Sequence, residues 1–285
     1  MKILPAFLLL LFSNGHAQLV LTDDLGRSVT LPSAAQRIVS LAPSITETLF
    51  ALGAGEQVRG VTGYCNYPPE ARNKESIGGL IAPSIEAILS LTPDLIIVTP
   101  EGNAQESFRQ VHATGIPVFV TNPRNIEGVR KSIRDIGFLT GRSEGAAALV
   151  RSMKQREDSL RSLPPTKIPL LLVISLQPLM VAGSGTFLSE MIELAGGDNL
   201  AAGTGMTYPT FSREQVVASD PDVILMPSGL PGMDDVLSFY PEWKDLEAFQ
   251  SGHVYEVDPD VISRPGPRVI EGAIRMRELL SKKNK

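Results

Sequence analysis

One segment of the chain occurs twice, and this duplication constrains the fold more than any other feature. Residues 82–102 read APSIEAILSLTPDLIIVTPEG, and residues 210–229 read TFSREQVVASDPDVILMPSG. Aligned on Pro-Asp, both copies have a serine, a glutamate two residues later, an apolar helical stretch and a run of aliphatic residues. Glu86 and Glu214 are equivalent (214 − 86 = 128). A duplication of this length predicts two lobes of similar build, with a paired acidic residue on each.

Strands alternate with helices in both halves of the chain. Aliphatic runs such as 37–41, 95–98 and 223–226 have the length of buried strands, and helical patterns separate them. Strands that are apolar on both faces and are joined by helices are typical of a mostly parallel sheet covered on both sides. We therefore predict an α/β protein, with an N-terminal lobe over residues 18–140 and a C-terminal lobe over residues 166–285.

Between these lobes the alternation stops, because two helical stretches follow one another over residues 127–163. The second, Ser143–Leu163, runs for about 20 residues, or about 30 Å at 1.5 Å per residue. This is long for a connector in an α/β domain, and two prolines end it. We predict that a single helix within residues 141–165 bridges the two lobes.

The first 17 residues have the features of a secretory signal. Lys2 precedes the apolar run Ile3–Phe12, and Gly15-His16-Ala17 places small residues where a signal peptidase cleaves. The run is shorter than the about 20 residues of a membrane-spanning helix, and no cysteine lies nearby for lipid attachment. We predict export and cleavage before Gln18, in preference to an N-terminal membrane anchor.

Composition argues against several classes of function. The net charge of −5, without a long basic run, gives no reason to expect a nucleic-acid partner. None of His16, His112 and His253 has a Cys, His, Asp or Glu at metal-ligand spacing, and the chain lacks a G-x-S-x-G elbow. Cys65 is the only cysteine, so an internal disulfide is impossible. We predict no catalytic or metal site, and a secreted enzyme is the alternative from another class.

A binding function fits two lobes better, since ligand sites favour the cleft between domains. Loops at the carboxyl ends of parallel strands should face that cleft. These loops combine aromatic residues with a few polar groups, which suits a bulky, partly planar ligand. Tyr67 either contacts such a ligand or packs on the following prolines, and Cys65 is either buried or close to the ligand. The predicted ligand contacts are Tyr64, Cys65, Asn66, Tyr208, Asp260 and Arg264.

The paired glutamates each fall in the first turn of a predicted helix. A carboxylate there gains roughly 0.3–1 kcal/mol from the helix dipole, which would explain either residue singly. It explains less well why both copies of the repeat keep the acid off the apolar face. Glu86 and Glu214 could instead engage arginines on a two-fold symmetric partner.

Several segments together resemble a known family. They are RIVSLAPSITETLFALG, GVTGYCNYPPEA, PSIEAILSLTPDLII and FSREQVVASDPDVIL, combined with the signal-like N-terminus and the long central helix. This combination resembles the class III substrate-binding proteins of ABC importers, which deliver cobalamin, haem and iron–siderophore complexes. The resemblance covers nearly all of the mature chain, and the segments YCNYPP and SREQV look most like the cobalamin-binding branch.

The resemblance implies a periplasmic, monomeric protein of two α/β lobes that passes a corrinoid to an ABC permease dimer in the inner membrane. Glu86 and Glu214 match the family's docking glutamates, which pair with arginines of the two permease subunits. Tyr64 and Tyr208 match aromatic residues that flank the corrin ring. Asp260 and Arg264 match polar cleft residues in the segment before the last helix.

The chain departs from the cobalamin-binding pattern at three cleft positions. Leu80, Thr99 and Met180 stand where that branch often has aromatic residues. The cleft is therefore less aromatic, and haem or a ferric siderophore is the alternative ligand. No residue is an evident cobalt ligand, so we expect shape, stacking and hydrogen bonds to hold the ligand. A helix-bridged pair of lobes should close only slightly on binding.

Overall fold

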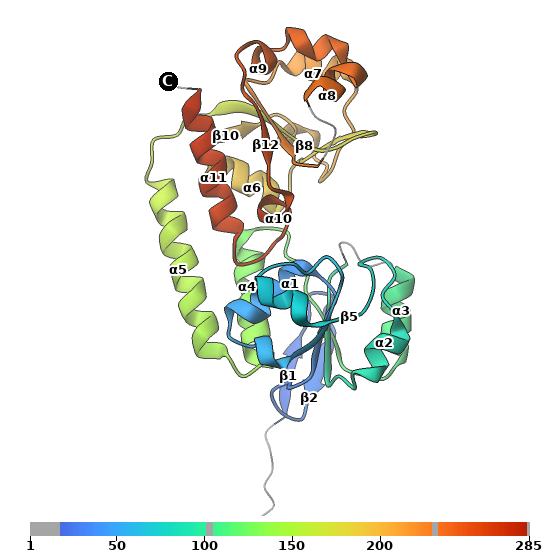
Figure 1. Ribbon diagram of the computed structural model, residues 1–285. Coiled ribbons are helices and arrows are strands. Elements are labelled where there is room, and N and C mark those ends of the chain that lie inside the picture. The colour runs from blue at the N-terminus through green and yellow to red at the C-terminus, as the bar shows by residue number, and fades with distance from the viewer. Residues whose placement is uncertain (1–17, 101–104, 230–232, 284–285) are drawn as a thin grey trace, which may run out of the picture.

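A computed structural model describes residues 18–100, 105–229 and 233–283, so the predicted signal segment lies outside the described residues. The chain forms two five-stranded sheets, one above the other, each flanked by helices (Figure 1). The predicted α/β architecture of two lobes, with mostly parallel sheets and one bridging helix, is confirmed.

The N-terminal lobe has a five-stranded sheet in the order β5-β4-β3-β6-β7, with every neighbouring pair parallel. Its central strands are buried on both faces because helices cover both sides. A short antiparallel hairpin, β1-β2, precedes the sheet. The strands are β1 (Leu19–Thr22), β2 (Ser28–Leu31), β3 (Ile38–Ser40), β4 (Val58–Val61), β5 (Glu75–Ser76), β6 (Leu95–Val98) and β7 (Val118–Val120). The helices are α1 (Pro43–Ala51), α2 (Ile85–Ser90), α3 (Gln105–Ala113) and α4 (Ile126–Leu139), with 3₁₀ turns η1 (Gly55–Gln57) and η2 (Pro69–Asn73).

The C-terminal lobe repeats this plan with a sheet in the order β10-β8-β11-β12, all parallel, and β9 added antiparallel to β8. The strands are β8 (Ile168–Leu176), β9 (Leu179–Val181), β10 (Gly197–Asn199), β11 (Val223–Pro227) and β12 (Val254–Val257). The helices are α6 (Phe187–Leu194), α7 (Arg213–Ser219), α8 (Met233–Phe239), α9 (Glu247–Gln250), α10 (Pro259–Ile262) and α11 (Val269–Lys282), with 3₁₀ turns η3 (Ala202–Thr204) and η4 (Pro241–Asp245).

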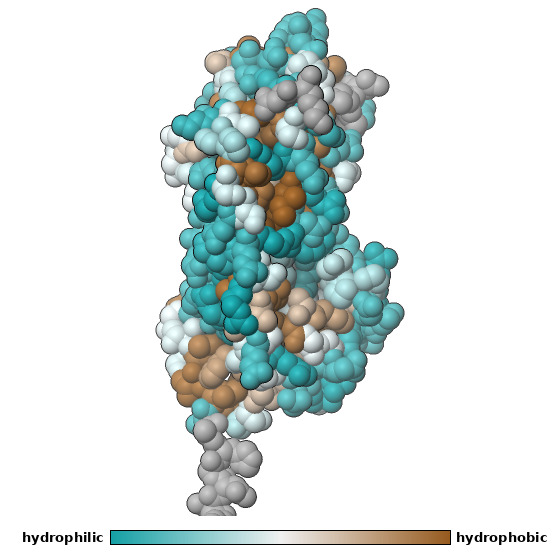
Figure 2. Space-filling view, turned by 90° about the vertical axis from the view of Figure 1, so that its left-hand side faces the viewer, coloured by the Kyte–Doolittle hydropathy of each residue, from teal (hydrophilic) through white to brown (hydrophobic). Residues whose placement is uncertain are grey.

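The bridging helix is α5 (Ser143–Arg161), which runs along one side of both lobes (Figure 1). Its inward side chains Met153, Glu157 and Leu160 are buried. The remainder of the helix is largely exposed and polar, and Figure 2 shows it as a hydrophilic column on that face. In the described part of the chain, no helix combines the length and apolarity needed to span a membrane.

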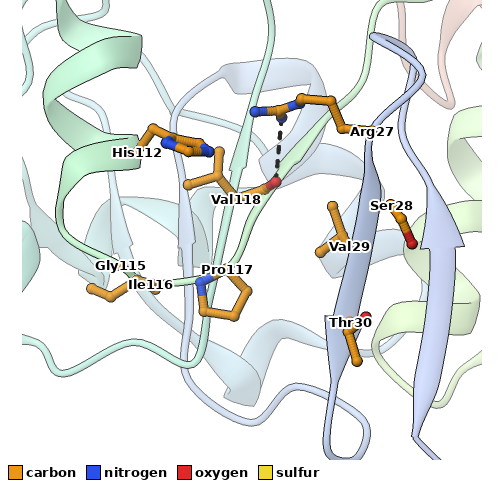
Figure 3. A pocket seen from close by; sticks show the side chains of 9 residues that line it. All are labelled: Arg27, Ser28, Val29, Thr30, His112, Gly115, Ile116, Pro117 and Val118. Carbon is orange, nitrogen blue, oxygen red and sulfur yellow. Dashed lines mark hydrogen bonds between the residues drawn. The ribbon is translucent and has the colours of Figure 1, made fainter.

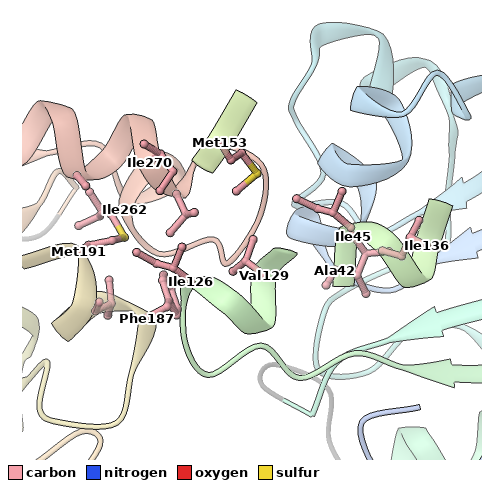
Figure 4. Packing of buried hydrophobic residues seen from close by; sticks show 14 of the residues in the cluster. Ala42, Ile45, Ile126, Val129, Ile136, Met153, Phe187, Met191, Ile262 and Ile270 are labelled. Carbon is pink, nitrogen blue, oxygen red and sulfur yellow. The ribbon is translucent and has the colours of Figure 1, made fainter. Parts of the chain in front are cut away.

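The two lobes share one hydrophobic core behind the cleft. Figure 4 shows Ile45 of the N-terminal lobe near α4, and Ile126 of α4 near Phe187 and Ile262 of the C-terminal lobe. These residues belong to one continuous buried cluster. Close packing across the junction, together with α5, fixes the lobes relative to one another more firmly than a flexible linker would.

Candidate ligand site between the lobes

A pocket of about 170 Å³ lies between the two lobes. The N-terminal lobe contributes the start of α1 after β3, Leu80 and the residue after β6, so the carboxyl ends of two parallel strands face the pocket. Typical small-molecule pockets measure about 300–1,000 Å³, so a bulky ligand must extend over the surrounding loops. The lining residues are Ala42, Pro43, Ser44, Leu80, Thr99, Ser263, Arg264 and Pro265.

A buried carboxylate joins the lobes beside this pocket. Glu47 of α1 has a side chain only 2% exposed. It accepts a hydrogen bond of 2.8 Å from Nη1 of Arg264 and two, of 2.9 and 2.7 Å, from Nε and Nη2 of Arg268. Both arginines belong to the C-terminal lobe, so these bonds link the two halves of the protein.

Three of the predicted ligand contacts complete this arrangement. The Asn66 side chain donates to Asp260 at 2.6 Å and accepts from Arg264 at 2.8 Å. Arg264 also donates to the Asp260 carboxylate, and Arg268 donates to the Asp260 backbone carbonyl. We call Glu47, Asn66, Asp260, Arg264 and Arg268 the interlobe clamp. Its two carboxylates and two guanidinium groups balance in charge.

The charge of Glu47 favours the protonated guanidinium of Arg268. Burial lowers the pKa of Arg268, but the hydrogen bonds and charge of Glu47 outweigh burial, so the pKa lies above its usual value. The Arg268 guanidinium also lies 4.0 Å from the centre of the Tyr67 ring. Tyr67 thus packs against a clamp arginine, while 45% of the residue stays exposed.

Tyr64 and Cys65 have opposite environments despite being neighbours. Tyr64 is 62% exposed, and its backbone carbonyl accepts a hydrogen bond from Arg264. Cys65 is buried, and its sulfur lies 3.1 Å from Oγ1 of Thr46 and 3.3 Å from Oγ1 of Thr62. The thiol is therefore buried against two threonines, and Cys65 is not among the residues that line the pocket.

Tyr208 is half-buried against the core shared by the lobes and is not among the residues that line the described pocket. Its loop is held to β9 by a hydrogen bond from Val181 to the Pro209 carbonyl and by another from Gly183 to Thr207. Met180, one of the three less aromatic positions, pairs with Thr210 at the end of this loop.

The paired glutamates lie apart from the clamp, on α2 and α7. Each is exposed and follows an N-cap serine, and that serine accepts the backbone N–H three residues on. Backbone N–H donation and the Ser212 hydroxyl lower the pKa of Glu214, which favours its ionised form. In the part of the chain that the structure describes, neither Glu86 nor Glu214 makes an ion pair.

The aspartates of the repeat have structural tasks instead. Asp94 accepts the backbone N–H groups of Gln36 and Arg37 at 2.8 and 3.0 Å, which fixes the entry to β3. Asp222 forms an ion pair with Lys283 after α11. The contacts of Asp94 and Asp222 therefore explain why the fold needs these aspartates, whereas no comparable contact among the described residues explains Glu86 and Glu214.

Sequence reasoning missed Glu47 and Arg268. A single charged residue inside the otherwise uncharged helix pattern SITETLF is a signal that could have identified Glu47 as a buried, paired group. Arg268 follows Arg264 by four residues in a segment already assigned to the cleft.

The other cavities lie outside the cleft or to one side of it. Figure 3 shows one of about 240 Å³ between β2, the end of α3 and the start of β7, where Arg27 donates to the Val118 carbonyl. It opens at the amino ends of the strands, opposite the cleft. No group of His, Cys, Asp and Glu that could hold a metal occurs among residues 18–100, 105–229 and 233–283.

Comparison with known proteins agrees with this architecture. The family model described as "Periplasmic binding protein" matches residues 38–261. The vitamin B12-binding protein of Yersinia pseudotuberculosis serotype O:1b is 31% identical over 266 residues, which cover 92% of each chain. The solved periplasmic vitamin B12-binding protein BtuF of Vibrio cholerae is 28% identical, with a TM-score of 0.76 over 88% of this chain and 98% of that one. The periplasmic heme-binding protein RhuT of Roseiflexus sp. RS-1 is 29% identical, with a TM-score of 0.77 over 88% and 100%. The chain therefore belongs to the periplasmic binding protein family.

Proposed function

We propose that this protein is exported to the periplasm, captures a corrinoid such as cobalamin between its lobes, and delivers it to an ABC permease. The vitamin B12-binding relative, aligned over most of both chains, supports this ligand class. Membership in a family of periplasmic proteins supports the location and a role in binding instead of catalysis.

The charge balance of the interlobe clamp is the observation that favours a corrinoid over an anionic siderophore. Arg264 lines the pocket and Arg268 lies beside it in the clamp; the Glu47 carboxylate pairs with both arginines, and the Asp260 carboxylate pairs with Arg264. An anionic ferric siderophore would have to compete with these carboxylates for the arginines. A corrinoid, whose periphery carries many uncharged carboxamides, needs hydrogen bonds and apolar contact without a free cation.

We propose Tyr64, Asn66, Tyr208, Asp260 and Arg264 as the ligand contacts. The exposed ring of Tyr64 offers a flat surface beside the clamp for stacking. The Cys65 thiol is left out of this set, because it is buried against two threonines.

Haem is the second candidate, and the exposed Tyr64 side chain is the observation that favours it. A phenol oxygen can ligate ferric haem iron, and one of the solved relatives binds heme. Tyr64→Phe separates the two ligands, because it keeps the ring and removes the oxygen. Corrin stacking should survive this change nearly intact, whereas an iron–phenolate absorption band would disappear.

The test is calorimetric titration of the purified protein with cyanocobalamin, haemin and a ferric hydroxamate, each with wild type and Tyr64→Phe. We expect saturable binding of cyanocobalamin that changes less than about threefold in the variant. No heat of binding with cyanocobalamin at micromolar concentration, together with haemin binding that needs the Tyr64 oxygen, would overturn the corrinoid assignment.

We further propose that Glu86 and Glu214 dock on the two permease subunits. They occupy equivalent places in the repeat, both are exposed, and a two-fold symmetric partner presents the same groups to each lobe. Glu86→Arg with Glu214→Arg should abolish docking and leave ligand affinity nearly unchanged. Glu56→Arg with Glu144→Arg is the matched control, because both residues are exposed, lie in first helical turns and give the same change of charge.

A further inference from the structure

The helices that carry the paired glutamates each expose a large apolar side chain as well. Leu89 of α2 is 45% exposed, and Val217 of α7 is 46% exposed. Each lies three residues after its glutamate, so the carboxylate and the apolar side chain occupy neighbouring positions on one helical face. The spacing within the repeat also relates the two apolar residues to each other (217 − 89 = 128).

Packing does not require these exposed side chains. The residue before each of them, Ile88 in α2 and Val216 in α7, is fully buried and anchors its helix to the lobe. Single exposed apolar residues are common on protein surfaces. Here they recur at equivalent positions of the two lobes, each time beside an exposed carboxylate without an ion pair among the described residues.

We infer that Glu86 with Leu89, and Glu214 with Val217, form two copies of one mixed docking patch for the ABC permease dimer. This inference rests on the docking function proposed above. A two-fold symmetric partner offers each lobe the same surface, so each lobe must present the same pair of groups. The chemistry of the patch calls for an arginine on the permease beside an apolar side chain or shallow apolar groove.

The apolar residue would shield the Glu–Arg ion pair from water, so that the ion pair can contribute to binding. An ion pair that stays in water is screened and contributes little. Leu89 or Val217, pressed against the permease, would exclude water from the adjacent Glu–Arg pair and strengthen it. The side chains themselves still have about half of their surface to bury in the complex.

The test uses an ABC permease–ATPase complex from the same organism, reconstituted in nanodiscs and chosen because the unmodified protein stimulates its ATP hydrolysis. In Leu89→Ser with Val217→Ser, we expect the affinity for this complex to fall about tenfold or more. Corrinoid affinity and the melting temperature should stay near their wild-type values. Leu163→Ser is the matched control, because Leu163 is 43% exposed but follows α5, a helix that lies on the side of the molecule away from α2 (Figure 1).

The outcomes separate this inference from the docking function beneath it. If Leu89→Ser with Val217→Ser docks as tightly as wild type while Glu86→Arg with Glu214→Arg does not dock, the apolar half of the patch is wrong and the docking function stands. If the glutamate variant docks normally, the docking function itself fails. Light scattering that finds a wild-type dimer and a Leu89→Ser with Val217→Ser monomer would assign the patch to a second copy of the chain and overturn the inference.

Discussion

Replacing Glu47 by Gln tests whether the interlobe clamp stabilises the junction of the two lobes. The glutamine keeps the size of the side chain and one acceptor oxygen, but it removes the negative charge. Its amide group would also place a donor against the guanidinium donors of Arg264 and Arg268.

The burial of the three side chains sets the expected magnitude. The Glu47 side chain is 2% exposed, and those of Arg264 and Arg268 are 11% and 15% exposed, so solvent screens these pairs little. Removing one partner of a buried ion pair costs about 3–5 kcal/mol, because the remaining charges lose their compensation. Since Gln retains one acceptor, we expect a loss of about 3 kcal/mol in the free energy of unfolding, or about 6–12 °C in melting temperature.

Thermal and urea unfolding of wild type, Glu47→Gln, Arg268→Gln and the double variant would measure this effect. The double variant should lose about 1–3 kcal/mol less than the sum of the single losses, because the two residues interact directly. Glu86→Gln is the control and should change stability by less than about 0.5 kcal/mol, since Glu86 is exposed. A melting temperature of Glu47→Gln within about 1 °C of wild type would refute the role assigned to the clamp.

Two further changes probe other parts of the structure. Gly183→Ala would place a Cβ atom 2.0 Å from the Met206 carbonyl oxygen. We therefore expect urea unfolding to show about 1–3 kcal/mol of destabilisation, and ligand binding to weaken because the Tyr208 loop is displaced. Gly203→Ala is the control, because nothing lies within 4 Å of the added Cβ atom. Burial raises the pKa of Glu157, but hydrogen bonds from two arginines outweigh it and hold the pKa below its usual value. Its stabilising effect is therefore fully present above pH 4.5, the ordinary value, and is lost as the pH falls through the folded-state pKa, so Glu157→Gln should flatten the acid limb of a pH–stability curve.

Local pattern predicted the elements well because their causes are local. Ser212 and Gln215 stand three residues apart at the start of α7, and they form the capping box that this spacing predicts. The bridging helix was expected over Ser143–Leu163 and extends over Ser143–Arg161. In each case the determining residues lie within a turn or two of one another.

The clamp could not be found in the same way, because its members are far apart in the chain. Arg264 and Arg268 lie 217 and 221 residues from Glu47, and no periodicity relates positions at such separations. Asn66, Asp260 and Arg264 were singled out as separate cleft residues, whereas the structure joins them in one network. The position of a polar group within a loop is readable from sequence, but its partner is decided by tertiary packing.

The clamp and the shared core together predict how far the lobes move when ligand binds. Closure by a large hinge motion would have to separate Glu47 from two arginines and open the apolar contact between α4 and the C-terminal lobe. Because these contacts would have to be lost, we expect ligand to change the radius of gyration by less than about 1 Å. Small-angle scattering with and without cyanocobalamin measures this change, and Glu47→Gln should show a larger one because only the core and α5 then resist motion. A change of several ångströms in wild type would mean that the clamp opens in use and that the charges of Arg264 and Arg268 become free to pair with an anionic ligand.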